Sequence, residues 1–340
     1  MNYLRRPRWR LPESAVTPEA AFWNRRMLMR AGLGAAAATV VAGCGEEGGG
    51  EANAQISGLF GGGDVVGLDT PQITPAPPLN PTYADAGRPV TDEEVNGSYN
   101  NFYEFDGGSK RIFRAAQALD TDGWTVECDG LVERPQTIGM EDLLSQMPLE
   151  ERIYRHRCVE RWAMVAPWIG FQLSALMDRV SPLSGAKYVR FESFYKPEIA
   201  PGQRNPLYPW PYVEGLTLQE AAHPLTFIVV GAYGKILPKQ FGAPIRLHTP
   251  WKYGFKCNKS IIKITFTDQR PIGLWEELQS REYGFWANVN PDVAHPRWSQ
   301  AVEEMLGTGE RVPTQIYNGY GEEVADLYAG MGDLGDALFR

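Results

Sequence analysis

The chain of 340 residues has only four cysteines, too few for a disulfide scaffold. It also has no apolar run of the roughly 20 residues that an ordinary transmembrane helix requires. Basic residues are scarce beyond the N-terminus: residues 1–44 carry a net charge of +5 and the rest −13, for a total of −8. Because phosphate contacts need Lys and Arg, so acidic a body excludes nucleic-acid binding.

Several catalytic signatures are missing as well. There is no GxGxxG, no P-loop, no HExxH, and no GxSxG between a strand and a helix. Nicotinamide-dependent, nucleotide-hydrolysing and hydrolase functions therefore lack support. There is also no CxxCH haem attachment and no iron–sulfur cysteine cluster, so these motifs identify no source of electrons for redox chemistry.

Apolar and aromatic residues are plentiful: hydrophobic residues make up 43% of the chain, with 10 Trp, 15 Tyr and 14 Phe. This excludes global disorder. From residue 91 onward, short strand patterns outnumber helix patterns, which predicts an α+β, strand-rich fold with one domain over 91–330 and a tail over 331–340. We expect strands over 124–132, 152–158, 188–195, 225–232, 245–249 and 260–267, and helices over 139–147, 171–180 and 218–223.

The N-terminus has the features of an export signal. Arg25 and Arg26 precede a 13-residue apolar run over 31–43, which favours the twin-arginine route, in which the translocase carries proteins that have already folded. We expect a signal over 1–54, a periplasmic location and a flexible Gly/Pro-rich lead-in over 55–90. Cleavage before a lipidated Cys44 is slightly favoured over cleavage after Ala54.

The first candidate for chemistry is Cys158. It lies among Arg155, Arg157 and Arg161, and such neighbours should lower the pKa of its thiol and favour the thiolate, which ligates a soft metal or attacks an electrophile. A buried structural cysteine is the alternative. A Cys158–His156 nucleophile lacks the third, orienting group of a triad, and the cysteines lack the paired spacing of a zinc site.

Three loops could complete a site. Residues 242–259 place Arg246, Lys252, Lys256 and Lys259 around a Pro/Gly loop that could bind a phosphate. Residues 98–105 combine amides and a carboxylate with aromatic rings, as a clamp for a flat heterocycle would. Residues 282–300, rich in aromatic and amide side chains, could line a pocket mouth. Ordinary surface or packed loops are the alternative in each case.

Taken together, these segments resemble one family. The sequence Arg157-Cys-Val-Glu160, followed by Trp162 and Pro167-Trp-Ile-Gly-Phe171, resembles the molybdenum-cysteine segment of the sulfite-oxidase-like molybdopterin enzymes. Further segments are similar to the catalytic subunits of exported protein-methionine-sulfoxide reductases: Asn100-Asn-Phe-Tyr-Glu104, Pro211-Tyr-Val-Glu-Gly215, Pro250-Trp-Lys-Tyr-Gly-Phe-Lys256, Tyr283-Gly-Phe285, Asn288-Val-Asn-Pro291 and His295-Pro-Arg-Trp-Ser-Gln300.

The resemblance implies one molybdenum–molybdopterin cofactor per chain, with Cys158 as the metal ligand and Glu160 as an organiser of water or protons. The implied cofactor-binding residues are Asn100, Tyr103, Glu104, Cys158, Ser193, Phe241, Arg246, Cys257, Asn258 and Lys259. Some positions depart from the family pattern. Ser193 stands for Thr, Phe241 for Asn or Asp, Cys257 and Asn258 for smaller or apolar residues, and Arg161 for a small residue.

The implied activity is the removal of oxygen from methionine sulfoxide in oxidised periplasmic proteins, by transfer of the oxygen atom to a Cys-ligated molybdenum. The implied partner is a membrane haem-binding subunit, fed by quinol or flavin, and the lone domain favours a monomer. Two alternatives stay open: a sulfite-oxidase-type enzyme on the same fold, and an exported binding lipoprotein without redox chemistry.

Overall fold

The computed structural model describes residues 65–105 and 112–340. The expected signal, its cleavage sites and Cys44 lie outside these residues. The α-helices are α3 (Glu93–Ser98), α4 (Ile112–Ala115), α5 (Met140–Gln146), α6 (Leu173–Val180), α7 (Leu218–Ala222), α8 (Leu274–Leu278) and α9 (Gly321–Val324). Single 3-10 turns are η2 (Pro81–Tyr83), η3 (Ala116–Ala118), η4 (Pro201–Arg204), η5 (Lys239–Phe241), η6 (Gly254–Lys256), η7 (Ile316–Gly319), η8 (Ala325–Tyr328) and η9 (Gly332–Phe339).

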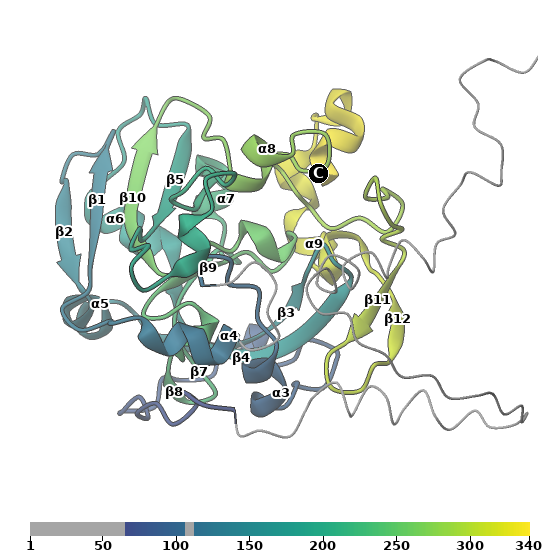
Figure 1. Cartoon of the computed structure of the whole chain (residues 1–340). Coiled ribbons are helices and arrows are strands. Elements are labelled where there is room, and N and C mark those ends of the chain that lie inside the picture. Colours follow the sequence, from purple (N-terminus) through teal and green to yellow (C-terminus); the bar gives the residue numbers. More distant parts are fainter. Residues whose placement is uncertain (1–64, 106–111) are drawn as a thin grey trace, which may run out of the picture. The chain divides into compact units, whose positions relative to one another are not determined.

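Two mixed sheets make up the body (Figure 1). The first has the order β2-β1-β10-β5-β6, with β1 and β10 parallel and the other neighbours antiparallel. Its strands are β1 (Thr125–Gly130), β2 (Gln136–Gly139), β5 (Tyr188–Ser193), β6 (Val213–Thr217) and β10 (Ile261–Thr267).

The second sheet has the order β12-β11-β4-β7-β8, with β3 added beside β4 and β9 beside β7. Its strands are β3 (Glu150–Arg157), β4 (Trp162–Gln172), β7 (Phe227–Ala232), β8 (Lys235–Ile236), β9 (Arg246–His248), β11 (Val302–Met305) and β12 (Arg311–Pro313). The strand-rich α+β prediction is confirmed.

The predicted elements follow from their burial patterns. Side chains of β5 alternate between partly exposed and buried, as its sequence pattern indicated, whereas every residue of β7 is buried. Strands or helices occupy all nine predicted positions, with shifts of a few residues at their ends. One boundary was wrong: α6 begins at Leu173, because Phe171 and Gln172 still belong to β4 and pair with β7.

The longest strand, β4, was not predicted. Its 11 residues are buried almost throughout, so they show no alternation, and Pro167 and Gly170 both suggest a loop. Gly170 sits at a register shift against β7, where a Cβ atom would lie 2.0 Å from the carbonyl oxygen of Ile228. The glycine therefore permits the bulge that keeps β4 in the sheet.

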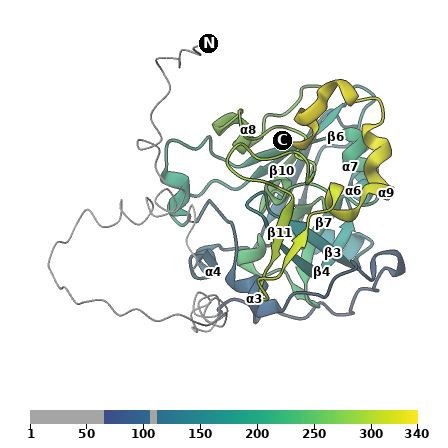
Figure 2. The same cartoon turned by 90° about the vertical axis from the view of Figure 1, so that its right-hand side faces the viewer.

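The segments at both ends of the body pack onto it. Residues 65–90, expected as part of a flexible lead-in, pair with strand edges instead: Ile73 N donates to Gly234 O and Asn80 N to Glu151 O. The expected tail contains η9, and Ala287 N donates to the carbonyl oxygen of Arg340 at 2.7 Å. Figure 2 shows these yellow C-terminal turns lying against the body near α7.

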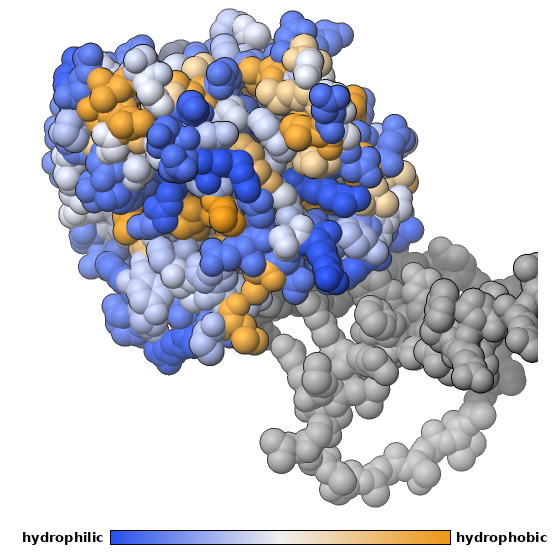
Figure 3. All heavy atoms as spheres, turned by 90° about the horizontal axis from the view of Figure 1, so that it is seen from above, coloured by the Kyte–Doolittle hydropathy of each residue, from blue (hydrophilic) through white to orange (hydrophobic). Residues whose placement is uncertain are grey.

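Within 65–105 and 112–340, no helix is both long and apolar enough to cross a bilayer. The face seen in Figure 3 is largely polar, with apolar patches separated by charged side chains.

Candidate cofactor-binding site

A cavity that is open to solvent, with about 850 Å³ of empty space when its open mouth is included, collects segments that are far apart in sequence. They are the chain after α3, the turn between β3 and β4, the start of β4, the η5–β9 segment and the η6 turn. The residues that line the cavity are Tyr99, Asn100, Asn101, Tyr103, Glu104, His156, Cys158, Val159, Glu160, Trp162, Met164, Trp168, Tyr212, Gln240, Phe241, Arg246, Gly254, Phe255, Cys257, Lys259, Trp275 and Tyr283.

Cys158 opens the tight turn that joins β3 to β4. Its N–H donates to the carbonyl oxygen of Trp162, and Arg161 adopts a left-handed φ of +74° to complete the turn. The thiol faces the cavity, where the N–H of Glu160 and the side-chain amide of Asn101 lie 3.4 and 3.6 Å from Sγ. Arg161 is exposed and does not line the cavity, so its charge does not shape the pocket wall.

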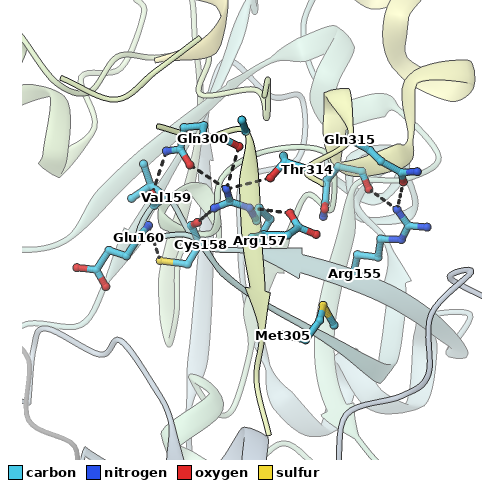
Figure 4. A network of polar contacts seen from close by, with 12 residues as sticks. Arg155, Arg157, Cys158, Val159, Glu160, Gln300, Met305, Thr314 and Gln315 are labelled. Atoms are coloured by element: carbon cyan, nitrogen blue, oxygen red, sulfur yellow. Dashed lines mark hydrogen bonds and ion pairs between the residues drawn. The ribbon is translucent and has the colours of Figure 1, made fainter. Parts of the chain in front are cut away.

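Arg157 anchors this turn from behind (Figure 4). Its guanidinium is fully buried and donates to Glu303 Oε2 and Gln300 Oε1 at 2.8 Å each, and to the carbonyl oxygen of Cys158. Glu303 also pairs with Arg88. The charge of Arg157 is thus balanced by a buried carboxylate and serves to hold the backbone of Cys158.

Because of this arrangement, the prediction that basic neighbours lower the pKa of the Cys158 thiol is wrong. Burial raises that pKa, the carboxylate of Glu160 raises it further, and Arg157 offsets only part of the increase. Arg155 points away and donates to Ala86 O and Gln315. A thiol in this state becomes a thiolate when a metal displaces its proton.

Polar side chains are also buried in the clamp, the segment of residues 99–104. Asn100 Nδ2 donates to Asn96 O at 3.1 Å, while its Oδ1 is buried without a hydrogen-bond partner among the described protein atoms. Glu104 is buried, which raises the pKa of its carboxyl group, and Ser193 Oγ lies 3.0 Å from Oε1. A Cβ atom at Gly202 would lie 1.9 Å from Tyr103 O. Only glycine at position 202 therefore lets η4 pack this closely against the clamp.

The cavity wall also carries two positive groups, Arg246 and Lys259. Arg246 Nη1 donates to the carbonyl oxygen of Phe241 at 2.8 Å, and Nη2 has no hydrogen-bond partner among the described protein atoms. Burial, with a contribution from Arg246, lowers the pKa of Lys259 to about 8. Phe241 therefore positions Arg246 through its backbone, which any residue could do, while its ring packs near Trp168.

Two lysines that we predicted for the same phosphate site are placed elsewhere. Lys252 is fully buried in an ion pair with Glu220, and Lys256 donates to Glu214 Oε2 at 2.6 Å. Neither lines the cavity. Their charges stabilise the loop rather than a ligand, because a buried lysine needs a carboxylate partner.

The family comparison agrees with this geometry. Residues 114–275 match the family model of the oxidoreductase molybdopterin-binding domain. This stretch, slightly under half of the chain, is similar to a molybdopterin-binding domain. Among solved structures, the sulfane dehydrogenase SoxCD from Paracoccus pantotrophus is similar, with 18% identity and a TM-score of 0.38. The match covers 44% of this chain and only 40% of that one.

The cavity of the molybdopterin-binding domain fits its cofactor, molybdenum–molybdopterin, which confirms the cofactor prediction. A pterin with its phosphate offers many hydrogen-bonding atoms, and the buried atoms without partners that face the cavity can pair with them. These atoms belong to Asn100, Trp162, Trp168 and Arg246. Cys158, the predicted metal ligand, offers a soft sulfur atom to the cavity.

Nine of the eleven predicted site residues line the cavity, and their roles stay predictions. The other two lie directly behind its wall. Ser193 Oγ contacts Glu104 and lies 2.8 Å from Lys259 O, while Asn258 Nδ2 donates to Tyr212 O at 3.2 Å. Both therefore support lining segments.

Sequence reasoning missed much of the apolar wall. Trp168, Gln240 and Trp275 were not singled out, although Trp168 belongs to the motif that follows the cysteine. From the expected mouth loop over 282–300, Tyr283 lines the cavity, whereas His295 borders a smaller neighbouring cavity. Aromatic abundance alone could not have separated these rings from the core.

Proposed function

We propose that this protein is a molybdopterin-dependent reductase that removes oxygen from methionine sulfoxide in exported proteins. In the overall reaction, the sulfoxide takes up two electrons and two protons and leaves as thioether and water. The bound cofactor supplies the two-electron exchange of an oxygen atom. The chain itself binds the cofactor, positions the side chain of the substrate and provides a route for protons.

The observation that carries this proposal is the character of the cavity mouth beside Cys158. Aromatic rings of Tyr99, Trp162 and Tyr283 line it, and such rings make favourable contacts with sulfur-containing side chains. The rings of Tyr99 and Trp162 meet edge to face, with centroids 5.2 Å apart. A neutral, partly apolar methionine sulfoxide suits this surface.

The charges near the thiol point the same way. Glu160, exposed and lining the cavity, accepts a hydrogen bond from Asn101 at 3.2 Å, close to Cys158. A carboxylate there repels a small dianion such as sulfite but accepts and returns protons for a neutral sulfoxide. Arg246 and Lys259 belong to the segments that we assign to the pterin phosphate, although Lys259 is also close enough to Cys158 to lower the pKa of its thiol.

We place the protein in the periplasm, exported in the folded state, with electrons supplied by a membrane haem-binding subunit. The twin arginines at 25–26 and the acidic body without haem motifs support this. Folded export allows the cofactor to be inserted before translocation.

Steady-state assays of the purified holoenzyme test the proposal. With a reduced viologen as electron donor, peptides containing methionine sulfoxide should be reduced, whereas sulfite with an artificial electron acceptor should turn over at least 100-fold more slowly. Glu160→Gln should lower the rate with sulfoxide and leave molybdenum content unchanged. Turnover of sulfite that exceeds that of sulfoxide would contradict the assignment.

A further inference from the structure

A second cluster of ligand-type side chains lies beside the cofactor cavity. His156 comes from β3, His248 ends β9, and Cys257 follows η6, so three separate segments converge there. One ligand atom from each lies within 4.8 Å of the others, and all three residues are buried. Two of the four histidines and one of the four cysteines of the chain are thus gathered at one point.

The atoms face each other at coordination distance. Cys257 Sγ lies 3.7 Å from His248 Nδ1. A metal with bonds of about 2.0 Å to nitrogen and 2.3 Å to sulfur holds such ligands about 3.6 Å apart. The imidazole rings of His156 and His248 are stacked with centroids 5.5 Å apart, and a ring nitrogen of His156 lies within 4.8 Å of the other two ligand atoms.

Hydrogen bonding within the protein leaves this cluster unsatisfied. His248 Nδ1 has only the thiol of Cys257, a weak donor, at 3.7 Å, and the other ring nitrogen, Nε2, is buried with no hydrogen-bond partner among the described atoms. Leaving such a group unpaired costs about 1–3 kcal/mol. Three soft or borderline ligands with no acidic residue in the cluster form a donor set that selects transition metals over calcium or magnesium.

We propose that His156, His248 and Cys257 form a copper site next to the molybdopterin cavity. Copper suits three-coordinate His₂Cys sites, whereas zinc in structural sites takes four ligands. The net charge of the site also favours Cu(I), because one Cu(I) ion, one thiolate and two neutral imidazoles make a site of zero net charge. A divalent ion would add net positive charge beside the buried guanidinium of Arg246.

The surroundings are those of a protected site with an entrance. Tyr154 and Trp168 pack on His248 with ring centroids 5.8 and 5.2 Å away, and exclude water from one side. His156 and Cys257 line the cofactor cavity, which gives the ion a path before the cofactor closes it. Thr249 Oγ1, 3.8 Å from Cys257 Sγ, is the nearest additional oxygen that the structure shows at the sulfur.

Metal analysis and spectroscopy on the purified full-length protein, produced without the molybdenum cofactor so that the cavity stays open, test this site. After treatment with a chelator and anaerobic loading with Cu(I), wild type should hold about one copper per chain. Oxidation should then give an intense visible sulfur-to-Cu(II) absorption. Cys257→Ser and His248→Val should each lower bound copper at least tenfold and abolish this band, while the buried control Cys128→Ser should retain both.

Cys158→Ser separates this site from the molybdenum ligand. Produced with the cofactor, that variant should lose molybdenum; produced without it, the variant should keep the copper, because the cluster is intact. The proposal is overturned if copper stays bound in Cys257→Ser, if it is lost in Cys158→Ser, or if zinc displaces Cu(I) at equal concentration. Failure of the reductase assay does not bear on these outcomes.

Discussion

The positive charge of Lys259 should help the protein to bind its cofactor but should lower the stability of the folded, cofactor-free protein. The pKa of this lysine falls from 10.5 to about 8, first because the ammonium is removed from water and second because Arg246 is nearby. At about 1.4 kcal/mol per pKa unit, this shift amounts to a cost of roughly 3 kcal/mol for keeping the protonated lysine in the folded protein. Replacing Lys259 with Met fills the same space without a charge.

The sign follows from proton binding. Between pH 8 and 10.5 the unfolded chain binds this proton and the folded chain does not, so stability rises with pH across that range. The penalty is therefore full below pH 8. We expect Lys259→Met to raise the free energy of unfolding of the cofactor-free protein by about 1–3 kcal/mol at pH 7, with the gain shrinking toward pH 10.

The same variant should bind its cofactor less well, because a cation is lost from the wall that faces the phosphate. Denaturant unfolding at pH 7 and 9.5 measures the first effect, and molybdenum per chain, expected to fall about tenfold, measures the second. Lys239→Met is the matched control, since Lys239 lies outside the cavity and its Nζ donates to Gln117 O at 3.3 Å. The electrostatic reasoning fails if Lys259→Met unfolds more easily than wild type. It also fails if the free energy of unfolding rises by the same amount at both pH values.

Three further outcomes are expected. Cys158→Ser should abolish sulfoxide reduction and molybdenum binding, and full turnover in this variant would refute the ligand role. Glu303→Gln leaves the buried charge of Arg157 largely uncompensated, so calorimetry should show a destabilisation of about 3–5 kcal/mol. Ser193→Ala removes the hydroxyl group beside Glu104, which should cost about 1–3 kcal/mol in chemical unfolding and lower molybdenum content, whereas Ser193→Thr should match wild type.

The sequence contained most of the fold where periodicity was clear. Alternation in β5 and the continuous apolar run in β7 are local signals, so both strands were predictable. Strand β4 was not, because a strand buried on both faces has no period and its Pro167 looks like a break. Its place is decided by pairing with β3 and β7, which lie on opposite sides of it.

The sequence predicted which segments form the site, but it did not predict which of their charged side chains face the cavity and which are paired inside the protein. Local sequence singled out Cys158 and suggested that nearby arginines lower the pKa of its thiol, and the family resemblance then implied its role as metal ligand. The partner that neutralises Arg157 is Glu303, 146 residues away, and Lys252 is neutralised by Glu220. No local pattern can tell a lysine that faces a ligand from one paired inside the protein, because the choice depends on long-range contacts.

Counting charges in the cavity explains why the wall is suited to an anion. Burial shifts Glu104 and Lys259 in opposite senses on the pH scale, the pKa of the carboxyl group upward and that of the ammonium downward, and both shifts favour the uncharged forms. Arg246 remains charged, and its buried Nη2 has no hydrogen-bond partner within 65–105 and 112–340. An anionic phosphate beside Arg246 would compensate that charge and favour protonation of Lys259, so cofactor binding in mildly alkaline solution should take up a proton. Cofactor binding thus offsets the free-energy cost of burying the charges of Arg246 and Lys259, so the stability of this part of the protein should depend on whether the cofactor is bound.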